Sequence, residues 1–382
     1  MLDTSSGASC AIRRMLLQLA RRGWRVDVIG ATVFDHPSGT SRLQDQWSLV
    51  QSDRGRVLTI NDGPIQHRVV VTRDTQREAM TSLEESKWFA LYEQVLGGER
   101  PDVVFYFGGQ PFDYLIAGEA RARNIPVAFY LANDNYGAGR WHRDIDLLLT
   151  DSHATSALYR GRLNRDVTPV GTFVAPADVV APRRDPRHVL FVNPLPEKGA
   201  RWVVALALWL ERHAPEMTLE VVESRGGWQH MLQTTTSVLG TPRDHLPNVV
   251  VTPHSQDMRP VYARAWLLVA PSLGWESAGR VIPEAMLNGV PVVCSDRGGM
   301  PEMVGAGGVV VRFDGKYYEK PWDLVPSEQE VAGLGRLVVS LRHDDRRYRQ
   351  LVGEAARMCA TAHDIERNTD RLVAALQALL SR

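Results

Sequence analysis

Short apolar runs alternate with amphipathic segments along most of the chain. The first runs are residues 24–31, 101–108, 125–133 and 144–152, each of which ends in small or polar residues. Residues 11–23 precede the first run. Apolar side chains recur there every three or four positions, as in an amphipathic helix, and Gly23 favours the end of that helix. Its apolar positions are Ile12, Met15, Leu16, Leu19 and Ala20. This alternation predicts parallel sheets with helices on both faces.

The alternation pauses once and then restarts, which indicates two domains. Residues 172–188 carry three prolines and a polar run, a composition typical of an interdomain crossing. The runs that follow are residues 189–193, 218–224, 248–252, 265–272 and 290–296. The pattern predicts an α/β chain of two doubly wound, Rossmann-like domains that face each other across a cleft. We expect an acceptor-side domain at 1–178 and a donor-binding domain at 179–361, with a C-terminal helix, 362–382, packing back on the first.

Three segments depart from this pattern. Residues 35–68 are long and polar for a loop, and we expect one hairpin in them. Residues 315–327 are aromatic-rich and irregular. At the start, only Met1 and Leu2 precede the polar stretch "DTSSGAS", although a doubly wound domain opens with a central strand. We therefore expect the first strand to be truncated in this sequence, with more residues in front of it in the natural chain.

Composition and charge argue against some classes of protein. The chain has 382 residues, of which 44% are hydrophobic and 23% charged, as in globular proteins. Its 44 basic and 44 acidic residues give a formal net charge of zero, which argues against a nucleic-acid binder. The three cysteines, Cys10, Cys294 and Cys359, show no metal or disulfide spacing. No apolar run approaches the ~20 residues of a membrane span, so we expect a cytoplasmic protein with at most peripheral contact with the inner face of a membrane.

The densest chemistry lies in "GWESAGRVIPEAMLNGVPVVCSD", residues 274–296. The apolar run before it ends at Ser272, and Pro283 is tolerated only in the first turn of a helix, so a helix should begin between Gly279 and Ile282. Glu276 then lies in the loop before this helix and Glu284 in its first turns. Both carboxylates are expected at the carboxyl edge of a parallel sheet, where such folds bind ligands.

The helix start and its neighbours suit a phosphate and a sugar. Backbone amides of Ala278, Gly279 and Arg280 at the helix start favour an anion. Carboxylates repel phosphate, so the two glutamates more naturally accept hydrogen bonds from sugar hydroxyls. In "FVNPLPEKGA", residues 191–200, Lys198 follows a strand end and a turn and offers a cation. The residues therefore point to a phosphorylated or nucleotide-linked sugar.

These motifs resemble the retaining GT-B glycosyltransferases of family four, also called glycosyl transferases group 1. "PEKG" resembles the donor-phosphate lysine motif, "ESAGRVIPEAMLNGVPVVCSD" the Glu-x7-Glu signature, and "RGGMPEMV" the loop over the donor sugar. "SSGAS" before the first helix resembles the family's small-residue loop near the donor or acceptor. The resemblance implies a GT-B fold and transfer of a hexose from a nucleoside diphosphate sugar to a hydroxyl, with retention.

The resemblance also implies roles for individual residues. Lys198 would neutralise the diphosphate and Glu276 would bind the hexose hydroxyls, and these two are the candidate catalytic residues. Glu284 would bind the ribose hydroxyls. The whole candidate donor site comprises Gly7, Ala8, Asn193, Lys198, Glu276, Ala278, Gly279, Arg280, Glu284 and Gly299. No cofactor or catalytic metal is implied, because the lysine and the helix amides would stabilise the leaving diphosphate.

Two departures keep other functions open. The family's arginine a few residues before the lysine is missing, since Asn193 and Pro194 occupy that neighbourhood, and Asn133 stands near the place of a histidine. A catalytically degenerate nucleotide-sugar-binding protein is one alternative, and an epimerase or phosphorylase on the same fold is another. The sequence names a nucleotide sugar as partner but leaves the acceptor open among saccharides, lipid-linked glycans and small molecules.

Overall fold

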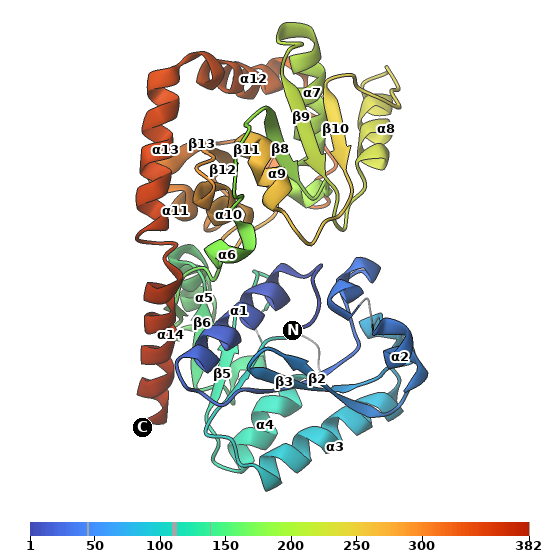
Figure 1. The fold of residues 1–382 in the computed structure, drawn as a ribbon, viewed down its shortest axis with the longest axis vertical. Coiled ribbons are helices and arrows are strands. Elements are labelled where there is room, and N and C mark those ends of the chain that lie inside the picture. Colours follow the sequence, from blue (N-terminus) through green and yellow to red (C-terminus); the bar gives the residue numbers. More distant parts are fainter. Residues whose placement is uncertain (44–45, 109–112, 138, 382) are drawn as a thin grey trace. The chain divides into compact units, whose positions relative to one another are not determined.

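The computed structural model describes residues 1–43, 46–108, 113–137 and 139–381. The chain forms two compact units: unit 1 is Met1–Phe173 with Ile365–Arg382, and unit 2 is Val174–Asp364 (Figure 1). The boundaries lie at 173/174 and 364/365, where the sequence predicts 178/179 and 361/362. The acceptor-side and donor-binding roles of the two parts remain predictions.

Unit 2 is a single parallel sheet covered by helices on both faces. Its strands are β8 (His188–Val192), β9 (Thr218–Val222), β10 (Val249–Thr252), β11 (Ala265–Ala270), β12 (Val292–Ser295) and β13 (Gly308–Val311). Its helices are α6 (Pro176–Val179), α7 (Ala200–His213), α8 (Trp228–Val238), α9 (Arg259–Arg264), α10 (Val281–Leu287), α11 (Met300–Val304), α12 (Glu328–His343) and α13 (Asp345–Cys359), with short 3-10 turns at Pro196–Lys198, Gly305–Gly307 and Gly315–Tyr318. The strand order is β10-β9-β8-β11-β12-β13, and β8, the first strand in sequence, lies in the middle.

Alternate side chains of the unit 2 strands fill two cores. Val189 and Phe191 of β8 pack with α7, α8 and α12 on one face, whereas Leu190 packs with α9, α10 and α11 on the other. All three side chains are at most 1% exposed. A strand buried on both faces is apolar at most of its positions, which explains why the run at 189–193 shows no polar alternation.

Unit 1 has the same kind of elements but two separate sheets (Figure 1). Its strands are β1 (Asp27–Ala31), β2 (Val57–Asp62), β3 (Ile65–Val70), β4 (Val104–Tyr106), β5 (Val127–Tyr130), β6 (Leu147–Thr150) and β7 (Thr168–Pro169). Its main helices are α1 (Gly7–Arg21), α2 (Trp47–Ser52), α3 (Ser82–Gly98), α4 (Tyr114–Ala122), α5 (His153–Leu163) and α14 (Ile365–Leu380), with 3-10 turns at Pro37–Leu43, Arg77–Ala79 and Arg140–His142. The sheets have the orders β1-β3-β2 and β4-β5-β6-β7.

Three local predictions concern unit 1: the hairpin, the first helix and the C-terminal helix. The hairpin expected in 35–68 is present as antiparallel β2 and β3, although β3 extends two residues beyond that segment. The first helix begins at Gly7, earlier than the expected Ala11, because Ser6 caps it by accepting a hydrogen bond from the Ser9 amide. α14 packs against α1, since Leu372, Leu376 and Leu379 share a core with the apolar face of α1.

Candidate active site

The loop after β8 brings Lys198 to the carboxyl edge of the unit 2 sheet. Asn193, at φ +64°, turns the chain out of the strand, and its side-chain oxygen accepts hydrogen bonds from the amides of Arg225 (3.1 Å) and Gly226 (3.2 Å). Gly199 closes the loop at φ +79°, where a Cβ would clash with the carbonyl oxygen of Pro271. Asn193, expected to bind donor, therefore joins the loop after β8 to the loop after β9.

Lys198 and Glu276 form an ion pair across two neighbouring strand ends. The Lys198 Nζ donates to Glu276 Oε1, and the Ser272 hydroxyl donates to the same oxygen at 3.0 Å. The side chains of Lys198 and Glu276 are 27% and 15% exposed, so the pair is largely but not fully withdrawn from water. β8 and β11 are adjacent in the sheet, which is why residues 78 positions apart meet.

The loop after β12 holds the backbone of Glu276. The Gly299 amide donates to the Glu276 carbonyl oxygen at 2.8 Å, and a Cβ at Gly298 would clash with that oxygen. The Arg297 guanidinium donates to the carbonyl of Leu273 at 3.0 Å. Glu276 is thus fixed by contacts from the ends of three adjacent strands, β8, β11 and β12.

The helix predicted after Glu276 begins at Val281, inside the expected range. Gly279 precedes it at φ +67°, a conformation that side chains other than glycine rarely adopt. Ala278 is buried and Arg280 stands at the N-cap position. The first amides of a helix have no intrahelical acceptor, so this end of α10 can contribute to anion binding.

Glu284 has a buried partner that the sequence did not predict. Its Oε2 accepts a hydrogen bond from the Tyr262 hydroxyl at 2.8 Å, and its Oε1 accepts one from Arg280 Nε at 2.6 Å. Tyr262 is fully buried, and this burial, together with the charge of Glu284, raises its pKa well above the usual value. The tyrosine therefore remains a protonated donor, and Glu284 keeps lone pairs for further hydroxyl donors.

The structure brings the predicted residues of unit 2 to adjoining loops. Lys198 and Glu276 are in direct contact, Gly299 contacts Glu276 through its backbone, and Arg280 contacts Glu284. Two further residues, Ser272 and Tyr262, were not among the predicted site residues. Ser272 could have been found as a polar residue at a strand end four positions before Glu276. Tyr262 carries no such signal, because it reads as an ordinary apolar position of a helix.

The two candidate residues of unit 1 open α1. Gly7 and Ala8 occupy its first two positions, and a Cβ added at Gly7 meets no atom within 4 Å. The packing of unit 1 therefore does not require glycine at position 7. Asn133 accepts a hydrogen bond from the Asn135 amide at 3.0 Å through its side chain, so this asparagine stabilises its own turn.

The described part of the chain offers neither a cluster of metal ligands nor a membrane-spanning helix. No group of three or more His, Cys, Asp or Glu side chains there could hold a metal ion. No helix there is long and apolar enough to cross a membrane.

Residues 186–317 match the sequence profile of the family described as Glycosyl transferases group 1. The fold is similar to that of sucrose-phosphate synthase from Thermosynechococcus elongatus, with a TM-score of 0.71, 16% identity, and coverage of 98% of this chain and 94% of that one. A glycosyltransferase from Rickettsia africae gives a TM-score of 0.65 at 12% identity, covering 96% and 93%. Anabaena Alr3699/HepE, solved with UDP and glucose, gives 0.64 at 17% identity, covering 92% and 100%. No curated protein sequence matches the chain at a significant level.

The matched segment, 186–317, contains every predicted site residue of unit 2, and the similarity in fold extends over both units. The chain has the GT-B fold, and its residues 186–317 form a glycosyl transferases group 1 domain.

Proposed function

We propose that the protein transfers a hexose from a nucleoside diphosphate sugar to an acceptor hydroxyl with retention of anomeric configuration. The observation that carries this proposal is the pair of anchored glutamates at adjoining strand ends. Glu276 is held by Lys198 and Ser272, and Glu284 by Tyr262 and Arg280. Two fixed acceptors beside a cation suit a ligand with two sugars joined by a diphosphate.

Each anchored group has one task in this reaction. Glu284 accepts hydrogen bonds from the ribose hydroxyls, and Glu276 accepts them from the hexose. Lys198 leaves part of its contact with Glu276 and approaches the diphosphate, whose negative charge grows as the anomeric C–O bond breaks. The leaving phosphate takes the acceptor's proton on the face of the sugar from which it departs.

The first donors to test are uridine diphosphate sugars. Anabaena HepE, similar in fold, was solved with UDP-glucose. At 17% identity this likeness extends to the fold, so the choice of base and hexose for this chain rests on experiment.

Donor binding is tested by thermal melting with UDP, GDP, ADP, TDP and their common sugar conjugates. We expect UDP and a UDP-hexose to raise the melting temperature of the wild type and to have little effect on Glu284→Ala. Glu328→Ala is the matched control, because Glu328 is 53% exposed on α12 and pairs with an exposed arginine. An equal shift in wild type and Glu284→Ala would contradict the ribose contact.

Turnover is tested by release of the nucleoside diphosphate over a panel of saccharide, lipid-linked and small-molecule acceptors, with the product's anomeric configuration read by NMR. Retention with Lys198-dependent release supports the proposal. Tight binding without release over the whole panel would favour the degenerate binding protein. Donor conversion without an acceptor would favour an epimerase, and a requirement for inorganic phosphate would favour a phosphorylase.

A further inference from the structure

The aromatic segment that follows β13 packs onto the core of unit 2. Tyr317 is 2% exposed and meets Trp202 of α7 edge to face, with ring centroids 4.9 Å apart. The Trp322 indole donates a hydrogen bond to the Tyr318 carbonyl oxygen at 3.2 Å. We call residues 315–322 the strap. These contacts make the strap part of the folded unit, although its sequence reads as an irregular excursion.

The Tyr318 hydroxyl joins the strap to the end of β12. It donates to Oδ1 of Asp296, the first residue after β12, and it accepts a hydrogen bond from the Phe313 amide at 3.0 Å. Burial and the bond to the Asp296 carboxylate raise the pKa of Tyr318 to about 12, so the hydroxyl stays protonated at neutral pH. The phenol ring is therefore held in one place beside the loop after β12.

The ring of Tyr318 supports the guanidinium of Arg297 in that loop. The guanidinium carbon lies 4.6 Å from the ring centroid, which is within the range of a cation–π contact. From this position Arg297 Nε donates to the carbonyl oxygen of Leu273 at 3.0 Å. Leu273 belongs to the loop after β11, so a single arginine links the loop after β12 to the loop that carries Glu276.

Trp322 contributes a second contact to the loop that carries Glu276. A Cβ added at Gly274 would lie 3.5 Å from Cζ2 of Trp322 and 3.0 Å from the Cβ of Glu197. The Glu197 carbonyl oxygen accepts hydrogen bonds from the amides of Leu273 and Gly274, both at 2.8 Å. The residues just before Glu276 are therefore enclosed between the strap and the loop after β8.

This support matters most when a donor is bound. In the proposed reaction Lys198 leaves part of its contact with Glu276 and approaches the diphosphate. Glu276 then depends more on the contacts that hold its backbone. One is the hydrogen bond from the Gly299 amide to the Glu276 carbonyl oxygen at 2.8 Å, and another is the bond from Arg297 to the same loop. Both contacts come from the loop that Tyr318 holds.

We propose that Tyr318 is a positioning residue for the hexose of the donor, because its ring holds Arg297 and Arg297 holds the loop that orients Glu276. This inference rests on the proposed function, in which Glu276 binds the hexose and Glu284 the ribose. The chain of contacts leads to Glu276, so loss of the Tyr318 ring should impair recognition of the hexose and leave recognition of the nucleotide unchanged.

The first test compares the dissociation constants of UDP-glucose and UDP, measured by calorimetry on the full chain. Tyr318→Leu should weaken the binding of UDP-glucose about tenfold relative to that of UDP. Tyr318→Phe keeps a ring under Arg297 and should retain most of the difference. Tyr348→Leu is the matched control, because Tyr348 is also a half-buried tyrosine of unit 2 and its hydroxyl bonds the Trp266 carbonyl. Equal effects of Tyr318→Leu and Tyr348→Leu would overturn the proposal.

A double-mutant cycle tests whether Tyr318 acts through Arg297. Arg297→Ala should cause the same relative loss of UDP-glucose binding as Tyr318→Leu. The double variant should lose no more than either single variant, because both changes remove the same support. Losses that add in the double variant would mean that the two residues act independently, which would also overturn the proposal.

Hydrogen exchange at the Gly299 amide gives a readout that needs no donor. This amide should exchange faster in Tyr318→Leu than in the wild type or in Tyr348→Leu, because the loop after β12 loses its support. Unchanged exchange at Gly299 would overturn the positioning role, whatever the donor measurements show.

Glu276→Ala separates this inference from the proposed function on which it rests. Loss of glucose-specific binding in Glu276→Ala but not in Tyr318→Leu would overturn the role of Tyr318 and leave the proposed function intact. No such loss in Glu276→Ala would contradict the proposed function itself, and the role of Tyr318 in hexose recognition would fall with it. Loss in both variants, with faster exchange at Gly299 in Tyr318→Leu, is the expected result.

Discussion

The sheets of the two units differ at one position. In unit 2 the sheet is continuous, and its first strand, β8, is paired on both sides and buried on both faces. In unit 1 the strands form two separate sheets, and β1 and β4, which are terminal strands of these sheets, are half-buried at most of their positions. The difference shows how much a doubly wound sheet depends on its central strand, since pairing and two-sided burial come together there.

The same difference affects the segments that lead into α7 of unit 2 and into α1 of unit 1. In unit 2 the loop after β8 starts from a strand fixed by two neighbours and delivers Lys198 to Glu276. In unit 1 the turn before α1 is held by the side chain of Asp3, which binds Ser5 and Asp35. A side-chain anchor can fix a turn, but a paired strand fixes the turn and the sheet at once.

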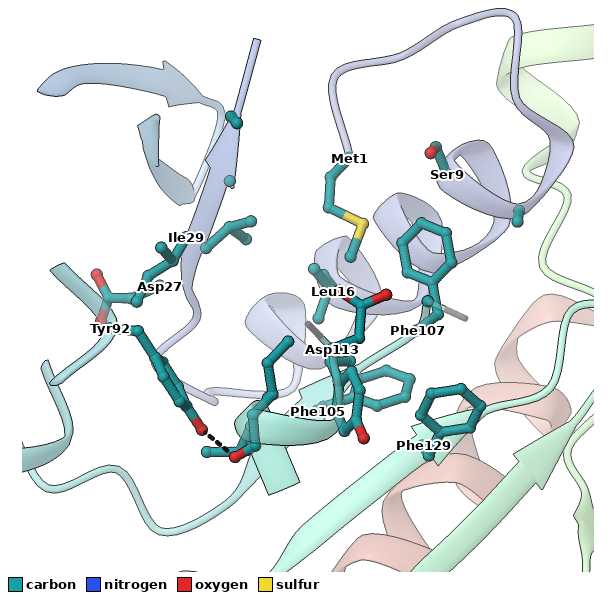
Figure 2. A pocket seen from close by; sticks show the side chains of 18 of the residues that line it. Met1, Ser9, Leu16, Asp27, Ile29, Tyr92, Phe105, Phe107, Asp113 and Phe129 are labelled. Carbon is teal, nitrogen blue, oxygen red and sulfur yellow. Dashed lines mark hydrogen bonds between the residues drawn. The ribbon is translucent and has the colours of Figure 1, made fainter. Parts of the chain in front are cut away.

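The largest contrast is expected in the free energy of unfolding when a charge is placed in β8 or in β4. Phe191→Asp in β8 should cost more than about 5 kcal/mol, because it removes a core ring and buries an unpaired carboxylate. Phe105→Asp in β4 should cost no more than about 2 kcal/mol, since Phe105 is half-buried and lines a cavity of unit 1 (Figure 2). Urea unfolding of both variants measures the difference, and similar losses of stability would remove the distinction between the two sheets.

The next largest effect is expected on catalysis. Lys198→Ala should lower kcat by about 10²–10³, by analogy with the loss of one preorganised charge stabiliser. Steady-state release of the nucleoside diphosphate measures it. Lys316→Ala is the matched control, because Lys316 is half-exposed and pairs with Glu330 on the surface of the same unit. A Lys198→Ala enzyme with wild-type kcat would remove the lysine from the mechanism.

Much of the fold was predictable because buried parallel strands leave a plain signal. The apolar runs at 189–193 and 265–272 correspond to β8 and β11, and the C-terminal helix expected in 362–382 corresponds to α14. The expected strands at 24–31 and 101–108 are longer than β1 and β4 as observed. Both shortened strands are terminal strands of their sheets, and a strand with a partner on one side only makes fewer backbone hydrogen bonds than the local sequence leads one to expect.

The candidate site was predictable only as far as its residues follow strand ends. Lys198, Glu276 and Glu284 could be placed at one sheet edge from the alternation of strands and helices. The contact between Tyr262 and Glu284 could not, because it joins α9 to α10 and depends on how the two helices pack. Asn193 stays a predicted donor contact, and its hydrogen bonds with the amides of Arg225 and Gly226, which join two loops, could not be predicted either.

A smaller effect is expected at the tyrosine that holds Glu284. Tyr262→Phe removes one buried hydrogen bond to a carboxylate, which should weaken donor binding by about tenfold and raise KM more than it lowers kcat. The raised pKa of Tyr262 keeps its hydroxyl protonated, so the loss should be the same at neutral and mildly alkaline pH. Tyr348→Phe is the control, because its hydroxyl bonds the Trp266 carbonyl at 2.7 Å, away from the glutamates. Equal KM changes in both variants would argue against a positioning role.

The smallest effect concerns the carboxylate of Glu220, which links neighbouring strands of the unit 2 sheet by hydrogen bonds. Glu220 on β9 is buried and bonds His188 of β8 at 2.9 Å, Thr252 of β10 at 2.7 Å and the Arg264 guanidinium. Burial alone would raise the pKa of Glu220, but hydrogen bonds from Arg264, His188 and Thr252 outweigh it and lower the pKa below 4.5.

A carboxyl whose pKa is lower in the folded than in the unfolded protein stabilises the fold above the unfolded pKa, and this stabilisation is lost as the pH falls through the folded pKa. Glu220→Gln should therefore melt a few degrees below the wild type at neutral pH, and the gap should close as the pH falls below 4.5. Melting curves from neutral pH to about pH 3 measure this gap, with the exposed Glu328→Gln as control. A difference in melting temperature that stays constant with pH would mean that Glu220 contributes through packing and not through its charge. The continuity of the unit 2 sheet would then depend on its apolar strands alone.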